Sequence, residues 1–85
     1  MLRSVAGGYG HWCPGCEEMH VFHVSRPAPS GARWTWDNNA EAPTFKPSMV
    51  VATRCHYFLT AGRIQFLDDC THALRGQTVD LPDLP

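Results

Sequence analysis

Cysteine and histidine residues that could hold a metal ion occur in two groups along this chain. The first is the pair Cys13-Pro-Gly-Cys16, and the second, about 40 residues later, consists of Cys55-His56 and Cys70-Thr-His72. Two thiolates at this spacing can bind one ion while the turn between them points backbone N–H groups at the sulfurs. Pro and Gly suit that turn, because Pro fixes φ and Gly tolerates a left-handed bend. We therefore predict one metal site that joins an N-terminal knuckle to the later group.

The later group lies on a predicted β-hairpin, residues 55–72. Two runs rich in aromatic and branched residues flank Ala61-Gly62, where glycine can take the positive φ of a tight turn. A two-residue turn pairs Tyr57 with Phe66. Because side chains alternate along a strand, this register sorts the remaining residues of the hairpin onto two faces. One face carries Cys55, Asp68 and Cys70, and the other carries His56, Leu67 and Asp69.

Thiolate-rich tetrahedral coordination favours zinc over magnesium or calcium, although iron also fits such a site. In an alternative ligand set, His56 or His72 replaces one of the later thiols, an arrangement that a β-bulge would favour. His20, four positions after Cys16, is a further candidate ligand or neighbour of the thiolates. A competing arrangement pairs the two later cysteines in a disulfide beside a free N-terminal pair. Our first prediction is a Zn²⁺ ion held by Cys13, Cys16, Cys55 and Cys70.

A closed site of four thiolates would leave several acid–base residues unused nearby. Such a site has no open position for water, so chemistry at the metal would need a labile ligand. The unused side chains could act as general acids or bases, or could support the ligands through hydrogen bonds. They are His20, His56, His72, Asp68 and Asp69.

Length and charge limit the possible classes of protein. The chain has 85 residues and a formal net charge of −1, which indicates one domain, residues 1–85, with a thin core. A net charge near zero argues against a protein that binds the phosphate backbone of nucleic acids without regard to sequence. The sequence has no signal-peptide pattern and no apolar stretch long enough to span a membrane. We therefore expect a cytoplasmic protein with reduced thiols.

Alternating and β-branched runs predict further strands at residues 17–25, 34–36, 49–53 and 77–81. Residues 5–9, a short segment interrupted by glycine, could be an edge strand or a lead-in to the metal knuckle. No segment has the periodicity of a long helix, and Gly76 limits residues 73–75 to one helical turn. The predicted fold is an all-β or β-rich small domain. It is a zinc-ribbon-like antiparallel sheet built on the central hairpin.

The segment Ala42-Pro-Thr-Phe-Lys-Pro-Ser48 predicts a stiff surface that could contact a partner. Its two prolines fix φ and restrict the residues before them, which would hold the polar side chains in place. Two nearby indoles could form the apolar wall of a groove. The alternative is a proline-rich sheet edge that blocks pairing with other chains. The predicted binding surface consists of Trp34, Trp36, Thr44, Phe45 and Ser48.

Several motifs together resemble a known family. The chain resembles small phage and prophage proteins of unknown function that are often mislabelled as ammonia monooxygenase, and related domains occur beside bacterial ubiquitin-like conjugation genes. No residues here resemble a membrane-embedded copper or di-iron site, so the oxygenase label has no support. The motifs are Trp12-Cys-Pro-Gly-Cys16, Trp36, Pro43-Thr-Phe-Lys-Pro-Ser48, Cys55-His56 and the run from Ile64 to Val79.

This resemblance covers nearly the whole chain and implies a phage or prophage origin, a metal-binding domain and no settled activity. The chain departs from the family between the Pro-Ser motif and the Cys-His pair, where residues 49–54 form a shorter segment. All candidate ligands occupy motif positions, so the resemblance supports a site without choosing its ligands. They are Cys13, Cys16, His20, Cys55, His56, Cys70 and His72.

These observations lead to one expected function and two alternatives. We expect a phage-encoded domain with structural zinc that acts as an accessory module binding a host or phage protein, with no catalytic residue assigned. The first alternative is a small metal-dependent hydrolase or transferase that uses His20, His56 or His72. The second is a zinc ribbon that binds nucleic acid, which would need basic residues to converge on one face.

Overall fold

The computed structural model describes residues 2–51 and 54–84, which form eight strands and no helix. Every strand pair is antiparallel, so the predicted all-β class is confirmed for these residues. The same part of the chain holds no helix that could cross a membrane. The strands are β1 Arg3–Val5, β2 Gly8–Cys13, β3 Glu18–His23, β4 Thr35–Trp36, β5 Phe45–Val51, β6 Cys55–Thr60, β7 Arg63–Phe66 and β8 Thr78–Asp80.

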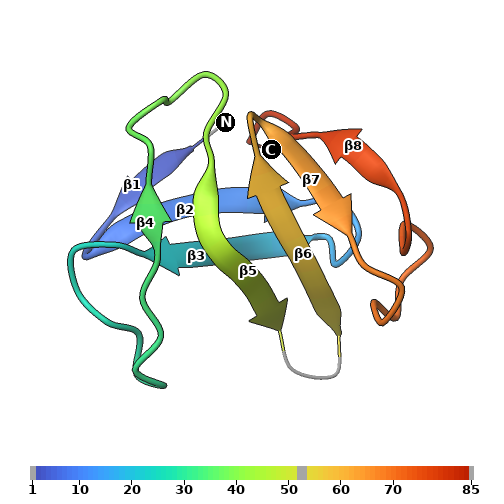
Figure 1. Cartoon of the computed structure of the whole chain (residues 1–85), viewed down its shortest axis with the longest axis horizontal. Coiled ribbons are helices and arrows are strands. Elements are labelled where there is room, and N and C mark those ends of the chain that lie inside the picture. Colours follow the sequence, from blue (N-terminus) through green and yellow to red (C-terminus); the bar gives the residue numbers. More distant parts are fainter. Residues whose placement is uncertain (1, 52–53, 85) are drawn as a thin grey trace.

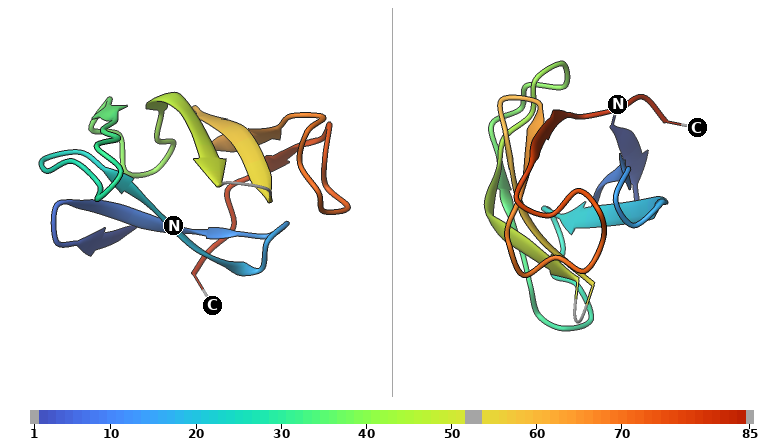
Figure 2. Two further views of the ribbon diagram at one scale, coloured as in Figure 1. Left: turned by 90° about the horizontal axis from the view of Figure 1, so that it is seen from below. Right: turned by 90° about the vertical axis from the view of Figure 1, so that its right-hand side faces the viewer.

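The strands form two sheets that pack face to face. One has the strand order β1-β2-β3, and the other has the order β4-β5-β6-β7-β8. Strands of the first sheet cross those of the second at a steep angle (Figure 1), and the two sheets form separate layers when viewed from the side (Figure 2). The core lies between them, because the buried side chains Tyr57 and Leu59 of β6 face the first sheet.

The predicted central hairpin is confirmed together with its register. Ala61 and Gly62 connect β6 to β7 with φ angles of 49° and 76°, the positive values that a tight hairpin turn needs. Tyr57 pairs with Phe66, as the two-residue turn predicts. Past β7 the chain stays beside β6, because the Leu67 N–H donates to the His56 carbonyl at 2.9 Å.

The other predicted strands correspond to β3, β4, β5 and β8, with shifted ends. The strand predicted at 49–53 begins earlier, at Phe45, and its residues 52 and 53 lie outside the described residues. Of the two alternatives for residues 5–9, a single edge strand does not form, because Gly7 turns the chain there with a φ of 84° and separates β1 from β2, which leads to Cys13. Residues 73–75 form turns rather than a helical turn.

A bulge in β5 changes its pairing with β6. The chain advances from Phe45 to Met49 along β5 while the paired strand β6 advances only from Leu59 to Tyr57. Because the two extra residues are an even number, Phe45 and Met49 stay on the same, core-facing side, while their partners on β6 are shifted. Ser48, the last residue before pairing resumes, lies on the outer face beside β6.

Aromatic stacking joins the two sheets. The rings of Phe22, on β3, and Phe45, on β5, stack with centroids 4.2 Å apart and planes only 3° from parallel. Phe45 is 1% exposed, and Trp34 is also buried, so these two members of the predicted binding surface belong to the core. The sequence prediction was wrong here because the two prolines suggest an exposed edge, whereas Phe45 begins β5 and shares its core-facing side with Met49.

We expect Phe45→Ala to lower the free energy of unfolding by about 3–5 kcal/mol, because it removes a ring from the stack between the sheets. The measurement is urea denaturation of the metal-loaded protein. Phe58→Ala is the matched control, because Phe58 is 39% exposed on the outer face, and it should cost about 1 kcal/mol or less. Equal losses in the two variants would contradict this assignment of the core.

Candidate functional site

Four side chains that can bind a metal converge at the open end of the β6–β7 hairpin. They come from the knuckle after β2, from the first residue of β6 and from the turn after β7. Their ligand atoms all lie within 4.8 Å of one another. The cluster consists of Cys13, Cys16, Cys55 and His72. A cluster of three thiols and one imidazole can hold a metal ion, as the sequence predicts.

The turn that follows Cys13 has the features of a metal knuckle. The Cys16 N–H donates to Cys13 Sγ at 3.4 Å. A side chain at Gly15 would collide with the His72 ring, which lies directly against the turn. Glycine is therefore required at this position so that His72 can approach the two N-terminal thiols.

Burial and mutual repulsion oppose ionisation of these thiols. The pKa of Cys16 is raised to about 11, mainly by burial and then by the neighbouring Cys13. The pKa of Cys55 is raised further, again by burial first and then by the charges of Cys13 and Cys16. Thiolates this close together need a cation to offset their repulsion, so the chemistry of the cluster fits a bound metal.

Cys70 lies beside the cluster and contacts the backbone of β6. Its Sγ accepts the His56 N–H at 3.2 Å and its thiol donates to the His56 carbonyl at 3.1 Å. Its Sγ is 3.8 Å from Cys55 Sγ. Of the two alternatives from the sequence, the structure places His72, rather than Cys70, in the four-residue cluster. Cys70 instead connects the segment after β7 to the start of β6.

A hydrogen-bonded chain of three side chains lies on the outer face of the larger sheet. The Ser48 hydroxyl donates to His56 Nε2 at 3.1 Å. His56 Nδ1–H donates to Asp69 Oδ2 at 3.0 Å. A serine, a histidine and an aspartate in this order of contact form the arrangement that activates a serine nucleophile.

The metal cluster and the Ser48–His56–Asp69 chain lie on opposite faces of one sheet. Cys55 is buried on the inner face, and the next residue, His56, points outward with 28% of its side chain exposed. Asp69 and Cys70 also lie on opposite faces, because Asp69 is 67% exposed and Cys70 is buried. The predicted register had already placed His56 and Asp69 on one face, and their hydrogen bond confirms it.

His20 is buried between the sheets, away from the four-residue cluster. Its Nδ1 lies 3.1 Å from the Tyr57 hydroxyl, whose other neighbour is His11 Nε2 at 2.5 Å. Burial, and then the proximity of His20, lowers the pKa of His11 to about 4. Burial also lowers the pKa of His20. Both imidazoles are therefore neutral, and they join β2 and β3 to β6 through the Tyr57 hydroxyl.

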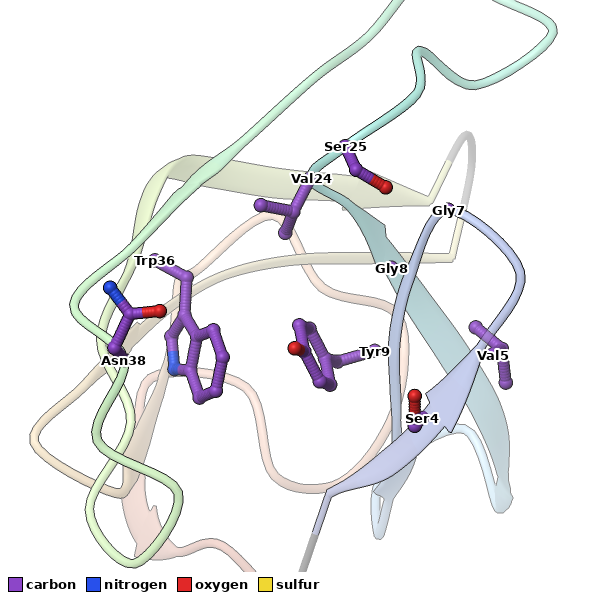
Figure 3. Close-up of a pocket in the computed structure, with 9 residues that line it drawn as sticks. All are labelled: Ser4, Val5, Gly7, Gly8, Tyr9, Val24, Ser25, Trp36 and Asn38. Carbon is purple, nitrogen blue, oxygen red and sulfur yellow. The ribbon is translucent and has the colours of Figure 1, made fainter.

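Thr44 and Trp36, two further residues of the predicted binding surface, contact different parts of the molecule. The Thr44 hydroxyl accepts the Ala61 N–H at 2.8 Å and so supports the hairpin turn. Trp36 is half-buried, and its ring lies 4.3 Å from that of Tyr9. These two rings are in contact, and both line a pocket of about 250 Å³ (Figure 3).

Residues 2–67 match the family described as bacterial ubiquitination-like system serine protease (BubE). The chain belongs to this family. No curated protein matches the chain, and no solved structure matches it either. The family's description names a serine protease, and the matched range includes Ser48 and His56 but ends before Asp69.

Sequence reasoning did not link Ser48 to His56. It assigned Ser48 to a binding surface. It gave His56 as an alternative ligand, and His56 and Asp69 as possible general acids or bases or supports of the ligands. The signal that could have found them is the shared outer face of His56 and Asp69, combined with a serine on the strand paired to β6. The buried His11 was also missed, although its pairing with His20 across β2 and β3 follows from strand register.

The variants His72→Ala and Cys70→Ala should separate the two ligand sets. We expect His72→Ala to lose its metal, because only three ligands remain in the cluster, and Cys70→Ala to keep it. Metal content per chain after exhaustive dialysis measures both. Loss of metal from Cys70→Ala alone would instead support the set of four cysteines.

Proposed function

We propose that this protein is a serine peptidase with Ser48 as its nucleophile, His56 as its general base and Asp69 as the group that orients His56. The observation that carries this proposal is the continuous hydrogen-bonded chain from Ser48 Oγ through both nitrogens of His56 to Asp69. Membership of a family described as a serine protease of a bacterial ubiquitination-like system supports the same activity. We further propose that the protein acts within such a system.

The geometry supports acyl transfer in two steps. Ser48 Oγ attacks the carbonyl carbon of the scissile bond while His56 Nε2 takes the hydroxyl proton. His56 then gives this proton to the departing amine, which leaves an ester between Ser48 and the acyl half of the substrate. A water molecule loses a proton to His56 and hydrolyses the ester, and the returned proton restores the Ser48 hydroxyl. Asp69 holds Nδ1–H throughout and stabilises the positive charge that develops on His56.

We propose that the cluster of Cys13, Cys16, Cys55 and His72 binds Zn²⁺ and that its role is structural. Three thiolates and one imidazole match the tetrahedral preference of zinc. When all four ligands bind, no position remains for a water molecule or a substrate atom. A closed site of this kind argues against the alternative of a metal-dependent hydrolase. The proposed reacting serine also lies on the opposite face of the sheet from the cluster.

The other expectations from the sequence stay predictions. A role as an accessory module that binds a host or phage protein, a phage origin and a cytoplasmic location are compatible with a peptidase, whose substrate would be the bound protein. The binding surface first chosen is weakened, because Phe45 lies in the core.

A fluorophosphonate probe should label the protein at Ser48, because such probes react with activated serine hydroxyls. We expect no labelling of Ser48→Ala, and a labelling rate at least about 100-fold lower for His56→Ala. Intact mass and peptide mapping measure the adduct. Ser30→Ala, which removes an exposed loop serine, is the matched control and should label normally. Unchanged labelling of Ser48→Ala would overturn the assignment of the nucleophile.

Metal removal should abolish labelling of Ser48, and replacement of zinc by Cd²⁺ should restore it to within about twofold, because the metal supports the fold without touching substrate. The measurement is the fluorophosphonate rate of the chelated and reconstituted protein, with circular dichroism to follow folding. A rate that follows the Lewis acidity of the metal would contradict a structural role.

A further inference from the structure

The strand that carries Ser48 has an open edge. β5 pairs with β4 only at Phe45 and Lys46, and within the described residues no strand pairs with Ser48–Val51 on that side. The Ser48 carbonyl points toward this edge, because it accepts the Trp34 Nε1–H at 3.3 Å. Backbone groups alternate between the two edges of a strand, so the N–H and C=O of Val50 point to the same open edge.

The outer face beside this edge is apolar. Val50 is 62% exposed and Phe58 is 39% exposed, and these are the large hydrophobic side chains that the described residues expose. Val50 is the cross-strand partner of His56, and Phe58 follows His56 by two residues on β6. Both side chains therefore lie on the same face as His56 and flank the Ser48–His56 contact.

We propose that the edge of β5 at Val50 is the docking site for the substrate, which binds as an extended peptide and adds a strand to the sheet. The proposal rests on the peptidase function of Ser48. The peptide backbone pairs with the N–H and C=O of Val50, and an apolar side chain of the peptide packs against Val50 and Phe58. Main-chain pairing of this kind is a common mode of peptide recognition.

The position of Trp34 explains where the peptide must stop. Its indole N–H already donates to the Ser48 carbonyl, so the peptide pairs its main chain with Val50 but extends past Ser48 without pairing there. Residues two positions apart in a strand are separated by about 6.6 Å. A peptide paired at Val50 therefore brings a carbonyl two residues further along its chain to the level of Ser48 Oγ. The open edge ends at the nucleophile, which is the geometry that cleavage requires and that a passive binding surface does not need.

The test uses acetylated tripeptidyl diphenyl phosphonates, which form an adduct with the nucleophilic serine, and compares each rate with that of a small fluorophosphonate. We expect probes with leucine or valine at the residue that pairs with Val50, two positions before the phosphonate, to label Ser48 about tenfold faster than probes with aspartate or lysine there. N-methylation should slow labelling about fivefold at the amide that pairs with Val50, and have little effect at the adjacent amide. This alternation follows from the period of a strand and needs no change to the protein.

Variants give an independent readout. Phe58→Ser should lower the ratio of the leucine-probe rate to the fluorophosphonate rate, whereas Thr60→Ala, an exposed change further along the same strand face, should not. Equal effects of N-methylation at successive amides, with fluorophosphonate labelling intact, would overturn the docking site and leave Ser48 as the nucleophile. Failure of the fluorophosphonate itself would overturn both proposals. A dimer that Val50→Pro dissociates would show that a second copy occupies the edge, which would also overturn this one.

Discussion

The alternation of side chains at the start of β6 is the constraint on which the candidate site depends. Cys55 turns inward to the metal cluster, and His56 turns outward to Ser48. The segment after β7 repeats this division, because Asp69 faces His56 while Cys70 bonds the backbone of His56. His56 and Asp69, two outward residues of the proposed catalytic chain, thus each have a neighbour that is held on the inner side. Contacts that hold Cys55 and Cys70 on the inner face therefore also set the distance between His56 and Asp69.

A domain of this size needs such an anchor. Its core is thin, and Asp69 lies in a segment outside the strands, where few packed side chains restrain it. Metal binding to a folded cluster contributes about 10–16 kcal/mol to folding in small zinc domains, which exceeds what a core of this size provides. The buried Tyr57 hydroxyl adds a second link, because it ties β6 to His11 and His20 of the other sheet. Together these contacts hold β6 from its inner face and leave its outer face free for chemistry.

The sequence predicted those features that follow from regular alternation and failed where alternation breaks. The Ala61-Gly62 turn set the register, and the register placed His56 and Asp69 on one face. Ser48 could not be placed beside His56, because the two extra residues of the β5 bulge shift the pairing with β6, and no local pattern marks their number. Phe45 had been assigned to the surface, although it shares the core-facing side of β5 with Met49. His72 and Cys70 follow the last residue of β7, where the period of a strand no longer orders side chains, so their roles could not be separated.

The separation of the candidate metal ligands and Ser48 on two faces also accounts for the interleaving of the two kinds of residue in the sequence. If the cluster supplied the reacting atom, its ligands would need an open position, and the buried Cys13 and Cys55 leave little access for a substrate. A serine on the outer face has no such conflict, because His56 and Asp69 are reached from solvent while their backbone is held from within. Interleaving Cys55 with His56, and Cys70 with Asp69, lets one short hairpin carry both the proposed anchor and the proposed catalytic groups. A small β domain could in this way position a nucleophile without the large core that usually supports one.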